Sequence, residues 1–139
     1  MLLVQLPPKL AFEEAVAAEF FAALRSRSAA GLVCEPRHAS WFTPEAERLL
    51  VEHRIARVAA DPVLCEGAGE PGGWRQLSYW RLHGSPVKYR SSYADRLVHY
   101  GALLEAEAAA GREVWCIFDN TASAAAAGDA LALMEAVRA

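Results

Sequence analysis

Gly31-Leu32-Val33-Cys34-Glu35-Pro36-Arg37-His38-Ala39-Ser40-Trp41 is the stretch that decides the fold. Its apolar first half predicts a strand, and its second half carries charged and aromatic groups. Thr43-Pro44-Glu45 follows directly and predicts a helix start, with an N-cap, a proline at the first helical position and an acid in the first turn. A buried strand that ends in ionisable residues before a helix is typical of a parallel α/β sheet, where ligands bind beyond the carboxyl ends of the strands.

The same arrangement recurs along the chain. Four further strands are predicted, at Leu2–Leu6, Ile55–Asp61, Tyr79–Gly84 and Val114–Phe118. Helices are predicted over about 12–27, 43–53, 93–110 and 122–137, and the glycine-rich segment 63–76 is predicted to be a loop. Strands alternating with helices in this order predict an α/β fold with a parallel sheet and right-handed crossovers.

Length and composition restrict the class of protein. The 139 residues suit one domain, and 54% hydrophobic residues indicate a protein with a packed core. A net charge of -3 argues against a broad nucleic-acid surface, and no apolar run is long enough for a membrane helix. The three cysteines have no metal-type spacing, so we expect reduced thiols and a cytoplasmic protein without a membrane partner.

The alternation of side chains along a strand predicts which polar groups share a face. We expect one face, suited to a barrel interior, to carry the polar side chains Glu35, Arg37, Asp61, Tyr79, Arg81, His83 and Asp119. The opposite face is expected to pack under helices and to carry Val4, Leu6, Leu32, Cys34, Val58, Ala60, Leu82, Cys116 and Phe118. In the first helix, Phe12, Val16, Phe20 and Leu24 follow i, i+4 spacing and predict the buried side.

These residue types favour an enzyme acting on an anion or phosphoester. Arg37 and Arg81 would hold the anion, because a guanidinium fork matches phosphate or carboxylate. Glu35 and Asp61 would act as base, and His83 as general acid or base. Tyr89 and Arg90 would close over the ligand.

Three other interpretations remain open. A divalent metal could bind Glu35, Asp61, His83 and His38, although the arginines would repel a cation and no compact ligand motif occurs; His38 could instead orient the Trp41 loop. A non-catalytic module could bind an anion, or could stack bases on Trp41, Tyr89 and Tyr93. The charged groups could also simply neutralise one another in the core. The sequence names no cofactor.

The chain resembles the YecE-like family, domain of unknown function seventy-two. The resemblance rests on several motifs in the same order: Gln5-Leu6-Pro7-Pro8, Glu35-x-Arg37-His38-x-Ser40-Trp41, Ala60-Asp61, Arg81-Leu82-His83-Gly84, Tyr89, Tyr93 and Phe118-x-Asn120. The resemblance implies a (β/α)8 TIM-type barrel whose activity is not established. Asp119 stands where the family tends to carry Asn, and Pro36 and Asp129 also depart from its pattern.

The resemblance covers only the fourth to eighth β/α units, so residues 1–139 are expected to form a single incomplete barrel domain with five parallel strands. The candidate catalytic residues are Glu35, Asp61 and His83. The candidate ligand-binding residues are Gln5, Arg37, His38, Trp41, Arg81, Tyr89, Tyr93, Asp119 and Asn120.

The strands at Leu2–Leu6 and Val114–Phe118 would lack neighbours in such a fragment. An uncovered sheet edge invites association, so we expect a homodimer through the open edges or a marginally stable chain. The alternatives are a monomeric open sheet and a truncated copy without activity. Proline at 36 cannot donate a ladder hydrogen bond, so the central strand is expected to end or bulge there.

Overall fold

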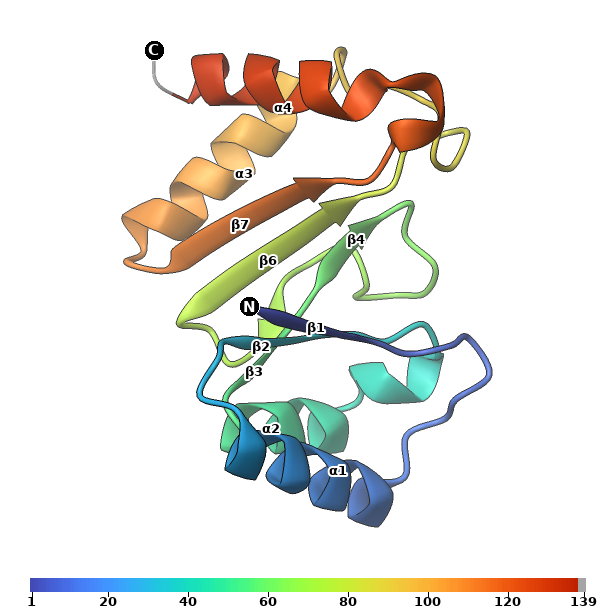
Figure 1. Cartoon of the computed structure of the whole chain (residues 1–139), viewed down its shortest axis with the longest axis vertical. Helices are drawn as coiled ribbons and strands as arrows, with labels where there is room; N and C mark the ends of the chain where they lie inside the picture. Colours follow the sequence, from blue (N-terminus) through green and yellow to red (C-terminus); the bar gives the residue numbers. More distant parts are fainter. Residues whose placement is uncertain (138–139) are drawn as a thin grey trace.

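The computed structural model describes residues 1–137 and shows an α/β architecture, with strands in the middle and one pair of helices on either side (Figure 1). Its elements are β1 (Leu2–Gln5), α1 (Glu14–Arg27), β2 (Leu32–Glu35), the 3-10 turn η1 (Ala39–Phe42), α2 (Pro44–Glu52), β3 (Ile55–Arg57), β4 (Ala59–Asp61), β5 (Gly72–Gly73), β6 (Leu77–Leu82), α3 (Leu97–Ala109), β7 (Glu113–Phe118), the 3-10 turn η2 (Thr121–Ser123) and α4 (Ala125–Ala136).

The strands form two sheets, in the orders β1-β2-β3-β5 and β4-β6-β7. All neighbours are parallel except β3 and β5. The prediction of an α/β fold with parallel strands is therefore confirmed, and the strands of residues 1–137 do not close into a barrel. β2 ends at Glu35, as expected from the missing N–H of Pro36.

The predicted strand Ile55–Asp61 is in fact two strands in different sheets. Val58 still donates its N–H to the Cys34 carbonyl at 2.9 Å, whereas the next residue, Ala59, lies opposite Trp80 of β6. Residues 55–57 of this stretch therefore pair with β2, and residues 59–61 pair with β6. Neither glycine nor proline marks the change of partner, so the sequence pattern contained no signal for it.

The predicted loop over 63–76 also contains a short strand. Gly72 and Gly73 pair antiparallel with β3, which makes the first sheet mixed rather than purely parallel. A Cβ atom at Gly72 would collide with the Arg57 guanidinium, and one at Gly73 with the Ile55 carbonyl. The glycines that argued for a loop are therefore what allows this close backbone approach.

The predicted buried side of the first helix is right for Phe12 and Leu24, which pack against the first core cluster, and wrong for Val16 and Phe20. Ala17 and Phe21 are buried, while Val16 and Phe20 are 62% and 49% exposed. This alanine-rich helix has apolar residues on both of these sides, so the i, i+4 spacing alone could not show which side is buried.

The starts of two other helices follow their local sequence. α2 begins as predicted, with the Thr43 hydroxyl accepting from the Ala46 N–H at 3.4 Å and Pro44 in the first position. α3 begins at Leu97, later than the predicted Tyr93, because the Tyr93 N–H donates to the Asp129 carboxylate and a turn precedes the helix.

The apolar residues form three clusters around the sheets. One lies between β1–β3 and helices α1 and α2, and a second between β4, β6, β7 and helices α3 and α4. The third covers the face of the strands that points away from the helices, which we call the inner face: Val33, Ala56, Val58, Leu77 and Tyr79.

The prediction that Val58 packs under helices is wrong, and Ala60 shares its parity. Residues 55–60 are apolar at both parities except Arg57, so alternation could not assign their faces.

Candidate functional site

Six polar side chains meet on the inner face where strands β1, β2, β6 and β7 end. We call them the carboxyl-edge cluster: Gln5, Glu35, Arg37, Arg81, His83 and Asp119. Each comes from the last residue of a strand or from the residues around it, so the parallel arrangement of the sheets brings them to one edge.

Glu35 is the buried centre of the cluster and is only 2% exposed. Its Oε2 accepts from Arg81 Nη1 at 2.5 Å, and its Oε1 lies 3.2 Å from His83 Nε2 and 3.3 Å from Arg37 Nη2. Burial by itself raises the pKa of Glu35, but the hydrogen bonds and charges of His83 and Arg81 outweigh it and lower the pKa to about 2. Glu35 is therefore a stable anion around which the cations gather.

Asp119 forms the more open end of the cluster, with its side chain 31% exposed. Its Oδ2 accepts from Arg81 Nη2 at 2.8 Å and lies 2.9 Å from His83 Nδ1. His83 thus stands between two carboxylates, and an imidazole donates at both nitrogens only when it is protonated. Arg81 also donates to Gln5 at 2.8 Å, which ties β1 to β6 across the inner face.

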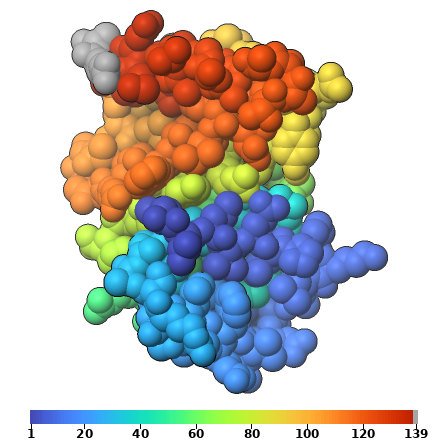
Figure 2. Space-filling view, in the orientation of Figure 1, coloured from blue at the N-terminus to red at the C-terminus, as the bar shows by residue number. Residues whose placement is uncertain are grey.

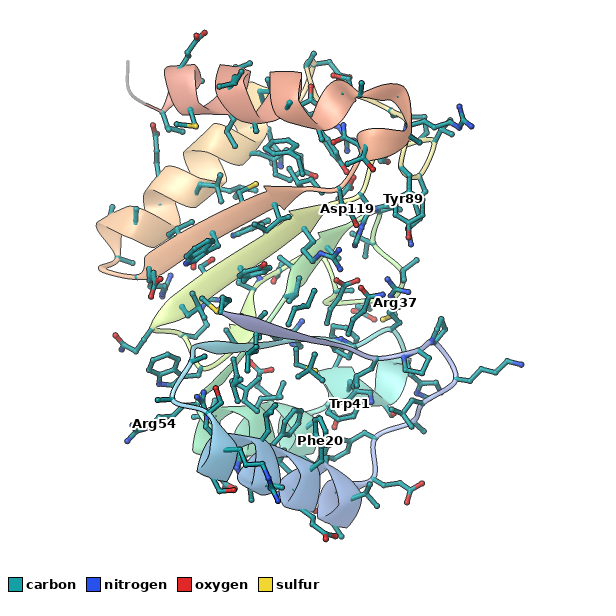
Figure 3. All side chains as sticks on the ribbon, viewed as in Figure 1. Phe20, Arg37, Trp41, Arg54, Tyr89 and Asp119 are labelled. Carbon is teal, nitrogen blue, oxygen red and sulfur yellow. The ribbon has the colours of Figure 1, made fainter. Side chains whose placement is uncertain are left out.

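Tyr89 lies beside His83 in the loop after β6. The two rings are perpendicular with centroids 6.0 Å apart, and Lys88 Nζ lies 4.9 Å from the Tyr89 ring centroid. Tyr89 has a φ of 64°, which is uncommon for a residue with a side chain, and its backbone is held by the His83 carbonyl and the Ala122 N–H. Arg37, Tyr89 and Asp119 lie on the same side of the molecule, near the tips of the strands (Figure 3).

Asp61 lies outside this cluster, contrary to the predicted shared face. Its Oδ2 accepts from the Tyr93 hydroxyl at 2.6 Å and from Arg96 Nη2 at 3.4 Å, and we call these three residues the outer cluster. Asp61 has the parity of Ala59, which packs in the core under α3 and α4. Burial, followed by the hydrogen bond to Asp61, raises the pKa of the Tyr93 hydroxyl. The outer cluster holds the residues just before α3 against the end of β4.

Three other candidate ligand-binding side chains support loops. Trp41 is buried, donates its Nε1 to the Leu10 carbonyl at 3.0 Å and packs edge-on against Phe12. His38 caps the turn η1, with Nδ1 2.8 Å from the Ser40 hydroxyl, which matches its suggested role in orienting the Trp41 loop. Asn120 is fully buried and donates to Asp129 at 2.7 Å.

Arg96 and Asp129 were missed as contributors to the architecture of this region. Asp129 accepts from the Tyr93 N–H at 2.9 Å and from Asn120, and Arg96 donates to the Ser85 carbonyl at 3.0 Å. An acidic residue in the middle of the alanine-rich stretch 124–130 was a signal for a buried partner. No comparable signal singled out Arg96.

Residues 1–137 were searched for metal-binding clusters and for membrane-spanning helices. Within them, no group of three or more His, Cys, Asp and Glu side chains is placed so that it could hold a metal ion. None of the helices in this part of the chain is both long enough and apolar enough to cross a membrane.

Parallel strands that alternate with helices define an α/β protein, and ionisable side chains gather at the carboxyl ends of its strands. The sequence matches the family described as protein of unknown function DUF72 over residues 1–139, and the chain belongs to this family. No protein of curated function matches the sequence.

Solved structures of the family share the fold at low sequence identity. A DUF72 family protein from Enterococcus faecalis matches with a TM-score of 0.80 and 17% identity, over 99% of this chain and 58% of that chain. One from Thermotoga maritima matches with a TM-score of 0.78 and 23% identity, over 99% of this chain and 57% of that chain. The chain therefore spans less than two thirds of the length of these relatives.

Proposed function

We propose that the carboxyl-edge cluster binds a small anionic ligand. The observation that carries this proposal is the gathering of Arg37, Arg81 and His83 around two carboxylates at the carboxyl ends of parallel strands. Lys88 adds a further positive charge next to Tyr89. The guanidinium groups of Arg37 and Arg81 match the geometry of a phosphate or carboxylate.

Arg37 is the side chain best placed to receive such a ligand. Its hydrogen bonds to Glu35 use Nε and Nη2, and within residues 1–137 its Nη1 makes no hydrogen bond. A phosphate or carboxylate oxygen can bind there without breaking the contacts of Glu35. Tyr89, 41% exposed, would border the same ligand.

In a complete barrel we propose that this site serves phosphoester hydrolysis. A water oxygen would attack phosphorus and give its proton to Asp119, the more exposed carboxylate. The ester P–O bond would break, and the leaving alkoxide would take a proton from the His83 imidazolium. Glu35, buried under two guanidinium groups, would position His83 rather than act as the base.

The competing candidate is a purely structural network. Every carboxylate of the cluster is already paired, and Arg81 has three hydrogen-bond partners, so the charges also neutralise one another without a ligand. Bases cannot stack on Trp41 or Tyr93, because both are buried, which leaves Tyr89 as the exposed ring among the three suggested.

We also propose how the chain relates to a whole barrel. The strands β1, β2, β3 with β4, β6 and β7 would be the fourth to eighth strands of an eight-stranded TIM-type barrel, in line with the 57–60% coverage of the longer relatives. Alone, two copies of the chain would associate through the β1 and β7 edges as a homodimer. The three free cysteines suit the reducing cytoplasm.

Calorimetric titration with inorganic phosphate and phenyl phosphate tests the ligand proposal. We expect saturable binding that Arg37→Ala weakens at least tenfold. Arg54→Ala is the matched control, because Arg54 lies on the side of the molecule opposite Arg37 (Figure 3). Absence of binding, or equal losses in the two variants, would favour the structural network.

A further inference from the structure

Tyr89 carries an exposed aromatic ring next to the carboxyl-edge cluster. The residue is 41% exposed, and its ring centroid lies 6.0 Å from that of His83, with the two ring planes perpendicular. The loop that contains it, yellow in Figure 2, lies at the surface beside the C-terminal part of the chain. A tyrosine ring offers a large and rigid contact area, because only two side-chain dihedrals have to be fixed. Tyr89 therefore presents such an area to a ligand of the cluster.

The backbone that carries this ring is fixed by hydrogen bonds. The φ of Tyr89, 64°, lies in the left-handed region, where a residue with a side chain is uncommon. Its N–H donates to the His83 carbonyl, and its carbonyl accepts from the Ala122 N–H at 2.9 Å. The Ser91 N–H closes the same turn by donating to the Val87 carbonyl at 2.9 Å. The ring is thus carried by a backbone that is ordered before a ligand binds, which lowers the entropic cost of binding.

His83 connects the Tyr89 ring to the anion site. It lies against Tyr89 and within 3.2 Å of Glu35, which in turn accepts from Arg37 Nη2 at 3.3 Å. A ligand with its anionic group at Arg37 and a ring at Tyr89 therefore has the bond between these two parts next to His83. Lys88 Nζ, 4.9 Å from the Tyr89 ring centroid, adds a positive charge close to the same ligand.

Two other exposed rings of residues 1–137 have different surroundings. Phe20 is 49% exposed and packs edge-on against Phe21, its neighbour in α1. Trp115 is 41% exposed and stacks on Tyr79, with ring centroids 6.5 Å apart. The aromatic neighbour of Tyr89, in contrast, is a member of the carboxyl-edge cluster. Tyr89 is therefore the exposed ring that a ligand of this cluster reaches.

We propose that the ligand is an aryl phosphate monoester, whose phosphate lies at Arg37 and whose aromatic ring stacks on Tyr89. The ester oxygen between the ring and the phosphate lies beside His83. In the hydrolysis proposed above the leaving group is then a phenoxide, which takes the proton from His83 and departs as a phenol when the P–O bond breaks. This inference rests on the proposed function, because it names the class of ester that the anion site binds.

Calorimetric titration of residues 1–139 with three phosphate monoesters tests this inference. Methyl phosphate supplies the anion alone, cyclohexyl phosphate adds a saturated ring, and phenyl phosphate adds a flat aromatic ring. At about pH 8 all three are dianions, because such esters lose their second proton near about pH 6. Phenyl phosphate is expected to bind about fivefold or more tightly than methyl phosphate. It is expected to bind about twofold or more tightly than cyclohexyl phosphate, because stacked rings attract each other beyond their contact area.

Three variants locate the contact. Tyr89→Asn removes the ring and keeps the backbone, because asparagine tolerates the left-handed conformation. It is expected to reduce the preference for phenyl over methyl phosphate to less than about twofold, whereas Tyr89→Phe is expected to retain this preference because it keeps the ring. Phe20→Ala is the matched control, since it removes an exposed ring from α1, well apart from Tyr89 (Figure 3), and it is expected to leave the preference unchanged.

The outcomes separate this inference from the anion site itself. Equal affinities for phenyl and methyl phosphate, or for phenyl and cyclohexyl phosphate, overturn the inference while the anion site stands. A preference that survives in Tyr89→Asn, or that falls equally in Phe20→Ala, overturns it as well. Failure of all three esters to bind, or binding that Arg37→Ala does not weaken, overturns the proposed function and this inference with it. The comparison of the three esters on the native chain does not depend on the folding of any variant.

Discussion

The carboxyl-edge cluster and the outer cluster use the same chemistry on opposite faces of the sheets. Each joins a carboxylate to an arginine near the end of a strand. Glu35, 3% exposed in its side chain, joins the end of β2 to the end of β6, whereas Asp61, 17% exposed, joins the end of β4 to the residues just before α3. Strand parity makes this difference, because Glu35 points to the inner face and Asp61 to the helices.

The comparison shows that a charged residue at a strand end has no fixed role. On the inner face Glu35 meets Arg81 and His83 at the end of β6, beside the partly exposed Asp119. On the helix face Asp61 meets Tyr93 and Arg96, which precede α3. The first environment can hold a ligand, and the second stabilises the residues just before α3.

Removing the central carboxylate should give the largest effect. Glu35→Ala is expected to lower the free energy of unfolding by about 3–5 kcal/mol, because Arg81 and His83 lose a buried anionic partner. Asp61→Ala is expected to cost less, since the Arg96 side chain is 31% exposed and can reach water. Urea denaturation followed by circular dichroism measures both values, and equal losses would contradict the contrast between the clusters.

Lowering the pH should remove the stabilisation of the fold that the ionised Glu35 side chain provides. The pKa of Glu35 is lowered to about 2 in the folded chain, so its stabilisation is complete above the ordinary carboxyl pKa and is lost as the pH falls toward 2. The loss amounts to at most about 3 kcal/mol. Comparing unfolding free energies at pH 6 and pH 3 for the native chain and Glu35→Gln checks it, and an equally steep pH dependence in the variant would exclude Glu35 as the source.

A milder change tests the outer cluster. Tyr93→Phe should destabilise the fold by about 1–3 kcal/mol, because the hydroxyl donates to Asp61 and accepts from the Gly84 N–H at 2.9 Å. Tyr89→Phe is the control and should change the stability by less than about 0.5 kcal/mol, since Tyr89 is exposed. Thermal unfolding of the pair decides whether the outer hydroxyl is structural.

The smallest effect concerns two residues with a left-handed backbone. Arg54 and Tyr89 have φ values of 53° and 64°, where glycine is favoured. Arg54→Gly should stabilise the chain by about 1 kcal/mol. Tyr89→Gly should gain less, because it also loses the ring beside His83, and it should weaken phosphate binding, whereas Arg54→Gly should not. Equal gains with unchanged binding would remove Tyr89 from the site.

Sequence patterns found the order of strands and helices, the start of α2 at Thr43 and the end of β2 before Pro36, because these depend on neighbouring residues. They also indicated Glu35, Arg37, Arg81, His83 and Asp119 as one group, since parallel strands bring their carboxyl ends together. They did not find the change of sheet at Val58, the exposure of Val16 and Phe20 in α1 or the separation of Asp61.

The sequence by itself determined the fold class, the family and the edge at which the polar residues gather, because local propensity, alternation and motif order are properties of the chain. Only the tertiary structure decided which face each residue occupies where both parities are apolar, and that Trp41 and Tyr93 are buried. These outcomes depend on which segments pack against one another. Packing between distant segments leaves no local pattern when several arrangements bury the same kind of side chain.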